Sequence, residues 1–63
     1  MRTFRVLVRH AGSATPSLHL VQSTDAAVAR AIADVLMRET PDALGVAVWD
    51  GERRIYALGE PPE

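Results

Sequence analysis

Apolar and polar residues alternate between residues 3 and 9 of this chain. One side of that alternation is wholly apolar, and the other carries arginines around Leu7. A period of two is typical of a half-buried β-strand. Residues 11–17 are small and polar and contain both Gly and Pro, which predicts a loop. Residues 18–22 then return to an extended pattern, so the chain opens with a predicted hairpin.

The period changes to three and four after residue 23, which indicates a helix. Ser23-Thr24-Asp25 is a typical helix start, because these side chains accept hydrogen bonds from free backbone N–H groups of the first turn. We expect the helix to reach about Glu39, since Pro41 disfavours a helical conformation in the residue before it. The stripe expected to face the sheet consists of Val28, Ala31, Ile32, Val35 and Leu36.

Two further strands are predicted at residues 44–49 and 53–58, on either side of an Asp50-Gly51 turn. The element order is therefore ββαββ. One helix covers one face of a four-stranded sheet, so we predict a single α+β two-layer sandwich in residues 1–58, with a mainly antiparallel sheet. Spatial strand orders 2-1-3-4 and 1-2-4-3 both satisfy this pattern. Residues 59–63 are expected to form a short flexible acidic tail.

The Asp50-Gly51 turn decides the direction of Trp49 and Tyr56, which are the only Trp and Tyr of the chain. A loop of two or four residues places both aromatic side chains on the sheet face that the helix leaves open. A three-residue loop with a bulge would break this phasing. We expect the even loop, and with it a shared open-face position for the two aromatic residues.

The long loop of the first hairpin leaves its register open. Pairing Val8 with Leu20 would place Leu18 and Leu20 beneath the helix and turn Val21 to the open face. The open face would then collect a contiguous apolar and aromatic patch interspersed with arginines, which is typical of an interface. The predicted interface residues are Leu7, Val21, Trp49, Arg54, Tyr56 and Leu58.

Composition narrows the classes of function. A chain of 63 residues forms one domain with a thin core, and the absence of cysteine excludes disulfides and thiolate metal sites. A partner subunit is then the most available source of further stability, so we expect a homodimer. The net charge of −1 gives no overall basic surface for nucleic acid. Without a signal-peptide pattern or a membrane-span-length apolar run, the protein is expected in the cytoplasm with no membrane contact.

Recognisable catalytic chemistry is absent from the sequence. His10 and His19 have opposite parity in the predicted strands, so no shared metal site is expected. Ser13 and Ser17 lie in or beside the first loop, without a nucleophile elbow or a recognisable Ser/His/Asp arrangement. We therefore predict no enzymatic activity, no catalytic residue and no cofactor.

The helix opening at residues 23–31 and the ending Val46-Ala-Val-Trp-Asp-Gly-Glu-Arg-Arg-Ile-Tyr-Ala-Leu58 carry a resemblance to known proteins. They resemble a group of short uncharacterised proteobacterial ββαββ proteins whose closing hairpin contains a Val-Trp-x-Gly segment followed by Arg. The resemblance implies the fold and a bacterial source, and it implies no site residues.

Two classes of function follow as hypotheses. The first is a non-enzymatic protein-interaction module that self-associates through its open sheet face or a sheet edge; the alternative for the aromatic pair is structural cover of the hairpin. The second class is a single-stranded nucleic-acid binder that stacks bases on Trp49, Tyr56 and His19 and contacts phosphates through Arg residues. The whole-chain charge weighs against this second hypothesis. A small enzyme is the remaining and weakest reading.

Overall fold

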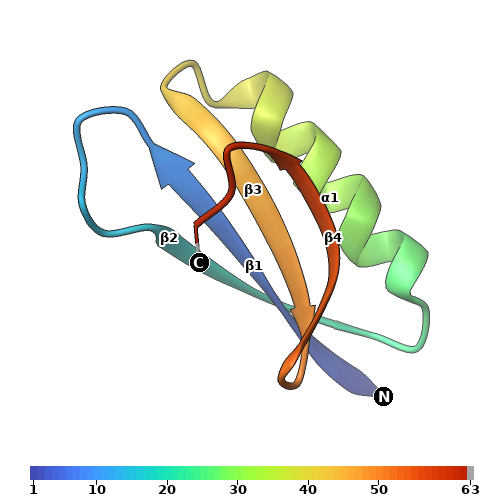
Figure 1. Ribbon diagram of the computed structural model, residues 1–63. Coiled ribbons are helices and arrows are strands. Elements are labelled where there is room, and N and C mark those ends of the chain that lie inside the picture. Colours follow the sequence, from blue (N-terminus) through green and yellow to red (C-terminus); the bar gives the residue numbers. More distant parts are fainter. Residues whose placement is uncertain (63) are drawn as a thin grey trace.

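The structure, a computed structural model, describes residues 1–62 as one four-stranded sheet with one helix packed on one face (Figure 1). The elements are β1 (Arg2–His10), β2 (Ser17–Ser23), α1 (Ala26–Glu39), β3 (Ala43–Asp50) and β4 (Arg53–Gly59). The spatial order is β2-β1-β3-β4, and all neighbouring strands are antiparallel. The predicted ββαββ α+β fold is confirmed, and of the two strand orders it is 2-1-3-4 that forms.

Helix α1 begins and ends where the sequence predicts. Asp25 is the N-cap residue, and its carboxylate accepts a 2.9 Å hydrogen bond from the backbone N–H of Ala27. This bond satisfies one of the N–H groups that the first turn leaves without a helical partner. Thr40 caps the other end through its backbone N–H, which donates to Leu36. Pro41 follows directly and prevents a further turn.

The predicted helix stripe is largely wrong. The helix residues that are fully buried are Ala29 and Ala33, whereas Val28 and Val35 are exposed. Small alanines allow the helix backbone to lie close to the sheet, over the valines of β1 and β3. The contact face of the helix is therefore the one that packs most closely, and not the one with the largest apolar side chains. The fully buried large side chains are Phe4, Val6, Val8, Val46 and Val48.

The register of the first hairpin, which the sequence left open, differs from the pairing of Val8 with Leu20 on which the predicted faces rest. Val8 pairs with Ser17 instead of Leu20, and Leu7 pairs with Leu18. Opposite residues in an antiparallel pair share a face, so this register turns Leu18 and Leu20 to the open face. Val21 instead pairs with Phe4 and packs against the core beneath the helix.

A bulge in β4 changes the faces of the second hairpin. The loop has two residues, Gly51 and Glu52, and Trp49 pairs with Arg54 as the even-loop prediction requires. One extra residue in β4, Ile55, then shifts the register, so that Val48 lies opposite Tyr56. An odd insertion sends every later side chain to the other face. The residues that follow, Tyr56 and Leu58, therefore pack on the helix side.

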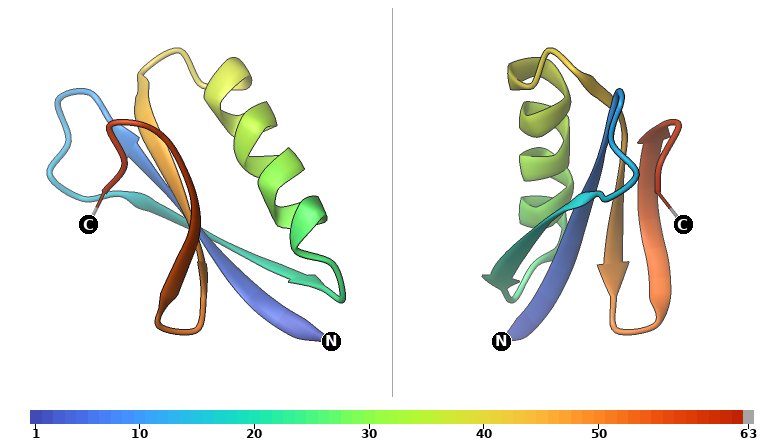
Figure 2. Two further views of the ribbon diagram at one scale, coloured as in Figure 1. Left: turned by 45° about the vertical axis from the view of Figure 1, so that its right-hand side comes forward. Right: turned by 90° about the vertical axis from the view of Figure 1, so that its left-hand side faces the viewer.

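After β4 the chain turns back across the open face of the sheet. Figure 2 shows α1 on one side of the sheet and this C-terminal segment on the other. The Glu60 backbone N–H donates to the carbonyl of Leu44 at 3.0 Å, and Pro62 is buried. Of the predicted flexible tail, Glu63 lies outside the described residues. The flexibility expected of residues 60–62 stays a prediction.

Candidate interaction surface

The structure separates the six residues predicted to form an interface. Leu7, Trp49 and Arg54 lie together on the open face, through the pairs that β3 makes with β1 and β4. The other three lie on the helix side, which corrects the prediction for Val21, Tyr56 and Leu58. The first is misplaced by the register of β2, and the other two by the bulge at Ile55. The exposed residues of the open face determine whether it can bind a partner.

Trp49 is partly covered by a side chain of its own chain. The guanidinium of Arg5 lies 5.7 Å from the centre of the indole and also donates a hydrogen bond to the carbonyl of Gly51. A guanidinium over an aromatic face is favourable, and here it also closes the hairpin turn. Within the described residues, the indole Nε1–H of Trp49 is buried and has no acceptor. Trp49 therefore acts in part as cover for the turn.

The most exposed apolar side chains of the sheet lie on β2. Leu18 is 55% exposed and Leu20 is 64% exposed, and both point to the open face beside Leu7 of β1. Single exposed apolar residues are ordinary, but adjacent ones on one face form a patch that a monomer rarely leaves in water. Sequence reasoning missed this patch, because alternation shows only that the two leucines share a face, and the pairing of Val8 with Leu20 put that face beneath the helix.

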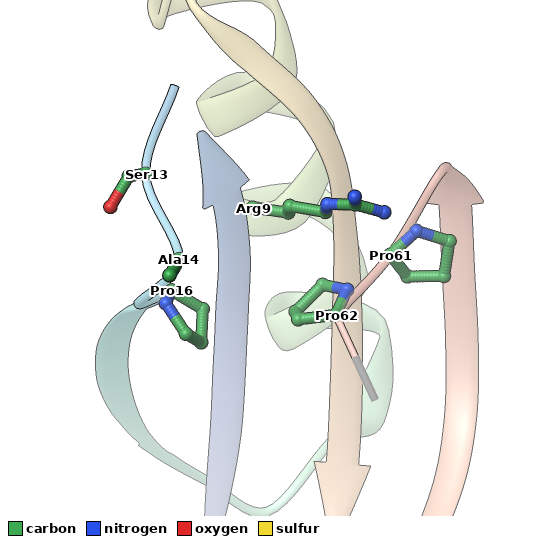
Figure 3. A pocket seen from close by; sticks show the side chains of 6 residues that line it. All are labelled: Arg9, Ser13, Ala14, Pro16, Pro61 and Pro62. Atoms are coloured by element: carbon green, nitrogen blue, oxygen red, sulfur yellow. The ribbon is translucent and has the colours of Figure 1, made fainter. Parts of the chain in front are cut away.

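Part of the open face, over Gly45 of β3, is already occupied. Ala47 of β3 faces this side, yet it is fully buried, and the backbone of Glu60 lies directly on Gly45. A groove of about 380 Å³ remains between this segment and the first loop. Figure 3 shows Arg9 extending across the groove from β1, with Pro61 and Pro62 on one side. The C-terminal segment therefore covers part of the open face over β3, while Leu18 and Leu20 of β2 stay exposed.

Tyr56 connects β4 to the helix. Its hydroxyl donates a 2.8 Å hydrogen bond to Oδ1 of Asp34. This hydrogen bond is the largest cause that raises the pKa of Tyr56 above its ordinary value of 10.0, followed by loss of water and by the charge of Asp34. The side chain thus contacts the helix on the helix side of the sheet, which removes Tyr56 as a stacking or contact group on the open face.

Three residues that sequence reasoning treated as unrelated meet at the end of β1. Oδ2 of Asp42 lies 3.2 Å from Nδ1 of His10, and Oγ of Ser17 lies 2.6 Å from Nε2 of the same ring. The three side chains join the end of β1, the start of β2 and the loop after the helix. The prediction that no Ser/His/Asp arrangement exists is wrong at the level of geometry. Only the fold could reveal it, because Asp42 is distant in sequence from the other two residues.

Two further features of the described residues bear on the kind of site. Among residues 1–62, no three His, Asp or Glu side chains gather in a way that could hold a metal ion. Within the same residues, no helix has the length and apolar character needed to cross a membrane. In comparisons with protein-family models, curated proteins and solved structures, nothing matches this chain. The resemblance to short proteobacterial proteins therefore stays a prediction.

Proposed function

We propose that this protein is a non-enzymatic interaction module that self-associates as a homodimer. The observation that carries the proposal is the exposed apolar patch formed by Leu18 and Leu20 beside Leu7. Burying an apolar side chain of this size contributes about 1.5–3 kcal/mol. For a domain with so thin a core, a gain of that size in two copies is a large part of its total stability.

Thermal melting at several protein concentrations tests the proposal. A dimer gains stability with concentration by mass action, so the midpoint rises as the chain is concentrated. A monomer melts at one temperature whatever its concentration. A midpoint that stays constant across the micromolar range contradicts self-association.

The nucleic-acid alternative has less support than the sequence suggested. Two of its three stacking groups leave the open face, since Tyr56 donates to Asp34 and His19 pairs with Val6 on the helix side. Trp49 is the stacking group left, and Arg5 already lies over its ring. Titration of Trp49 fluorescence with single-stranded oligonucleotides at low salt tests the alternative, and quenching at low micromolar concentration would favour it.

A second candidate function rests on Asp42, His10 and Ser17. The contacts fit the order that activates a serine when His10 carries its proton on Nδ1: the carboxylate of Asp42 then accepts the Nδ1–H, and Nε2 accepts the hydroxyl proton of Ser17. Oγ could then attack the carbonyl carbon of an activated ester, the proton passing through Nε2 to the departing alcohol. The candidate ranks second, because Asp42 is 55% exposed and the nearby groove is lined by Arg9 and Pro16 rather than by the reactive pair.

Covalent labelling separates this candidate from a structural role. A fluorophosphonate reagent that adds to Ser17 in the native chain, and to neither Ser17→Ala nor His10→Ala, supports a nucleophile. Intact mass measurement reads the addition directly. An unlabelled native chain leaves the three residues as a structural link between β1, β2 and the loop before β3.

A further inference from the structure

The two edges of the sheet differ in how well they resist pairing with another strand. Strand β4 begins with Arg53 and Arg54 and carries the bulge at Ile55, and both features are known to discourage edge-to-edge association. Strand β2 has neither. Its seven residues contain no charged side chain and no proline, and they pair with β1 without a shift of register. β2 is therefore a regular, unprotected edge.

We infer that β2 is the dimer seam, paired antiparallel with β2 of a second copy; this inference rests on the proposed self-association. A second copy fits this edge, because an uncharged strand meets itself across a two-fold axis without placing like charges opposite one another. The same strand carries the two exposed leucines, Leu18 and Leu20. The C-terminal segment lies on the open face over Gly45 of β3, which disfavours a flat face-to-face dimer.

Symmetry and strand length then fix the register. A two-fold axis perpendicular to the sheet keeps both helices on the same face and pairs residues whose side chains share a face. Pairing all seven residues places Ser17 opposite the partner's Ser23 and Leu20 opposite the partner's Leu20. Leu18 lies opposite the partner's Gln22. The result is a continuous eight-stranded sheet with the leucines of both copies gathered on the face away from the helices.

Single cysteines test this register directly, because the chain contains none. Opposite residues of an antiparallel pair have Cα atoms about 4.5–5.5 Å apart, within the range that a disulfide spans. Two copies of Leu18 would be displaced by four residues, roughly 13 Å along the strands. Under mild oxidation, Leu20→Cys should therefore form a linked dimer at least about tenfold faster than Leu18→Cys. Ala57→Cys on β4 is the control for random collision.

The outcomes separate this inference from the proposed function. If the native chain has two-copy mass but the Leu18→Cys or Ala57→Cys variant links fastest, the β2 seam is overturned and self-association is left intact. If the native chain has single-copy mass and no cysteine variant links preferentially, the β2 seam and the proposed self-association are both overturned. The β2 edge is then left to a strand of a different protein. Hydrogen exchange on the unaltered chain checks the result if a variant misfolds. Protection of β2 amides that rises with concentration supports the seam, and constant protection overturns it.

Discussion

Gly45 of β3 lies directly opposite Gly59 of β4, and the backbone of Glu60 passes so close to Gly45 that a Cβ there would overlap it. Gly59 has a φ of 62°, a left-handed conformation that glycine adopts without strain. The two glycines together allow the chain to reverse and lie on the open face. The pair therefore lets the C-terminal segment lie on the open face over β3, while Leu18 and Leu20 of β2 stay exposed.

Gly45→Ala should lower the thermal midpoint, because the new methyl group meets the backbone of Glu60 rather than a flexible side chain. Overpacking of this kind costs about 1–3 kcal/mol. The matched control is the same substitution in a chain that ends at Gly59, where the obstacle is gone and the cost should disappear. An equal loss in both chains would show that the C-terminal segment is not the cause.

Tyr56 should ionise above its ordinary pKa of 10.0, because its hydroxyl donates to Asp34. The raised pKa means that the folded state holds this proton more tightly than the unfolded chain does. The resulting stability is complete below about pH 10 and is lost as pH rises through the folded-state pKa. Tyr56 is the only tyrosine, so tyrosinate absorbance reports it directly. Asp34→Asn should lower the midpoint of this titration, and an unchanged midpoint contradicts the contact.

The link between His10 and Ser17 should stabilise the end of the first hairpin. His10→Ala removes two side-chain hydrogen bonds, each of which contributes about 0.5–1.5 kcal/mol net. Urea unfolding at low protein concentration measures the loss. A double-mutant cycle with Ser17→Ala isolates the contact, and it should give a coupling energy of at least about 0.5 kcal/mol. Strictly additive effects would mean that the 2.6 Å contact contributes nothing to stability.

Arg5→Ala should uncover Trp49. The change removes a guanidinium over the indole and a hydrogen bond to the carbonyl of Gly51. The emission of Trp49 should shift to longer wavelength, and quenching by acrylamide should increase. Stability should fall by about 0.5–1 kcal/mol for the lost cation–π contact at an exposed site. Arg9→Ala, on the same face but beside the C-terminal segment, should leave the Trp49 emission unchanged.

The sequence predicted the elements and their order, because turns and caps are local signals. The residues around Asp25, Pro41 and Gly51 are sufficient to bound α1 and the second hairpin. Relative position is harder to predict. The apolar run from Ile55 to Leu58 does not alternate, so it contains no information on phase, and the bulge at Ile55 passes unnoticed.

The sequence did not predict the exposed apolar patch on β2, for a related reason. Alternation in β2 shows only that Leu18 and Leu20 share a face, and the register with β1 sends them outward. The helix contacts mainly β3 and β1 through Ala29 and Ala33, so the inner face of β2 needs few large apolar side chains. Which face of β2 lies beneath the helix depends on tertiary packing, and no local sequence pattern indicates it.

Sedimentation of the native chain beside a Leu18→Lys, Leu20→Lys double variant tests self-association through β2 most directly. Both leucines are exposed, so the variant should keep the monomer fold, while the charges should prevent pairing of the two edges. Ala57→Lys, on the opposite edge strand, is the matched control. We predict two-chain mass for the native chain and the control, and single-chain mass for the double variant. Single-chain mass for the native protein across the micromolar range, or two-chain mass for the folded double variant, would contradict the account.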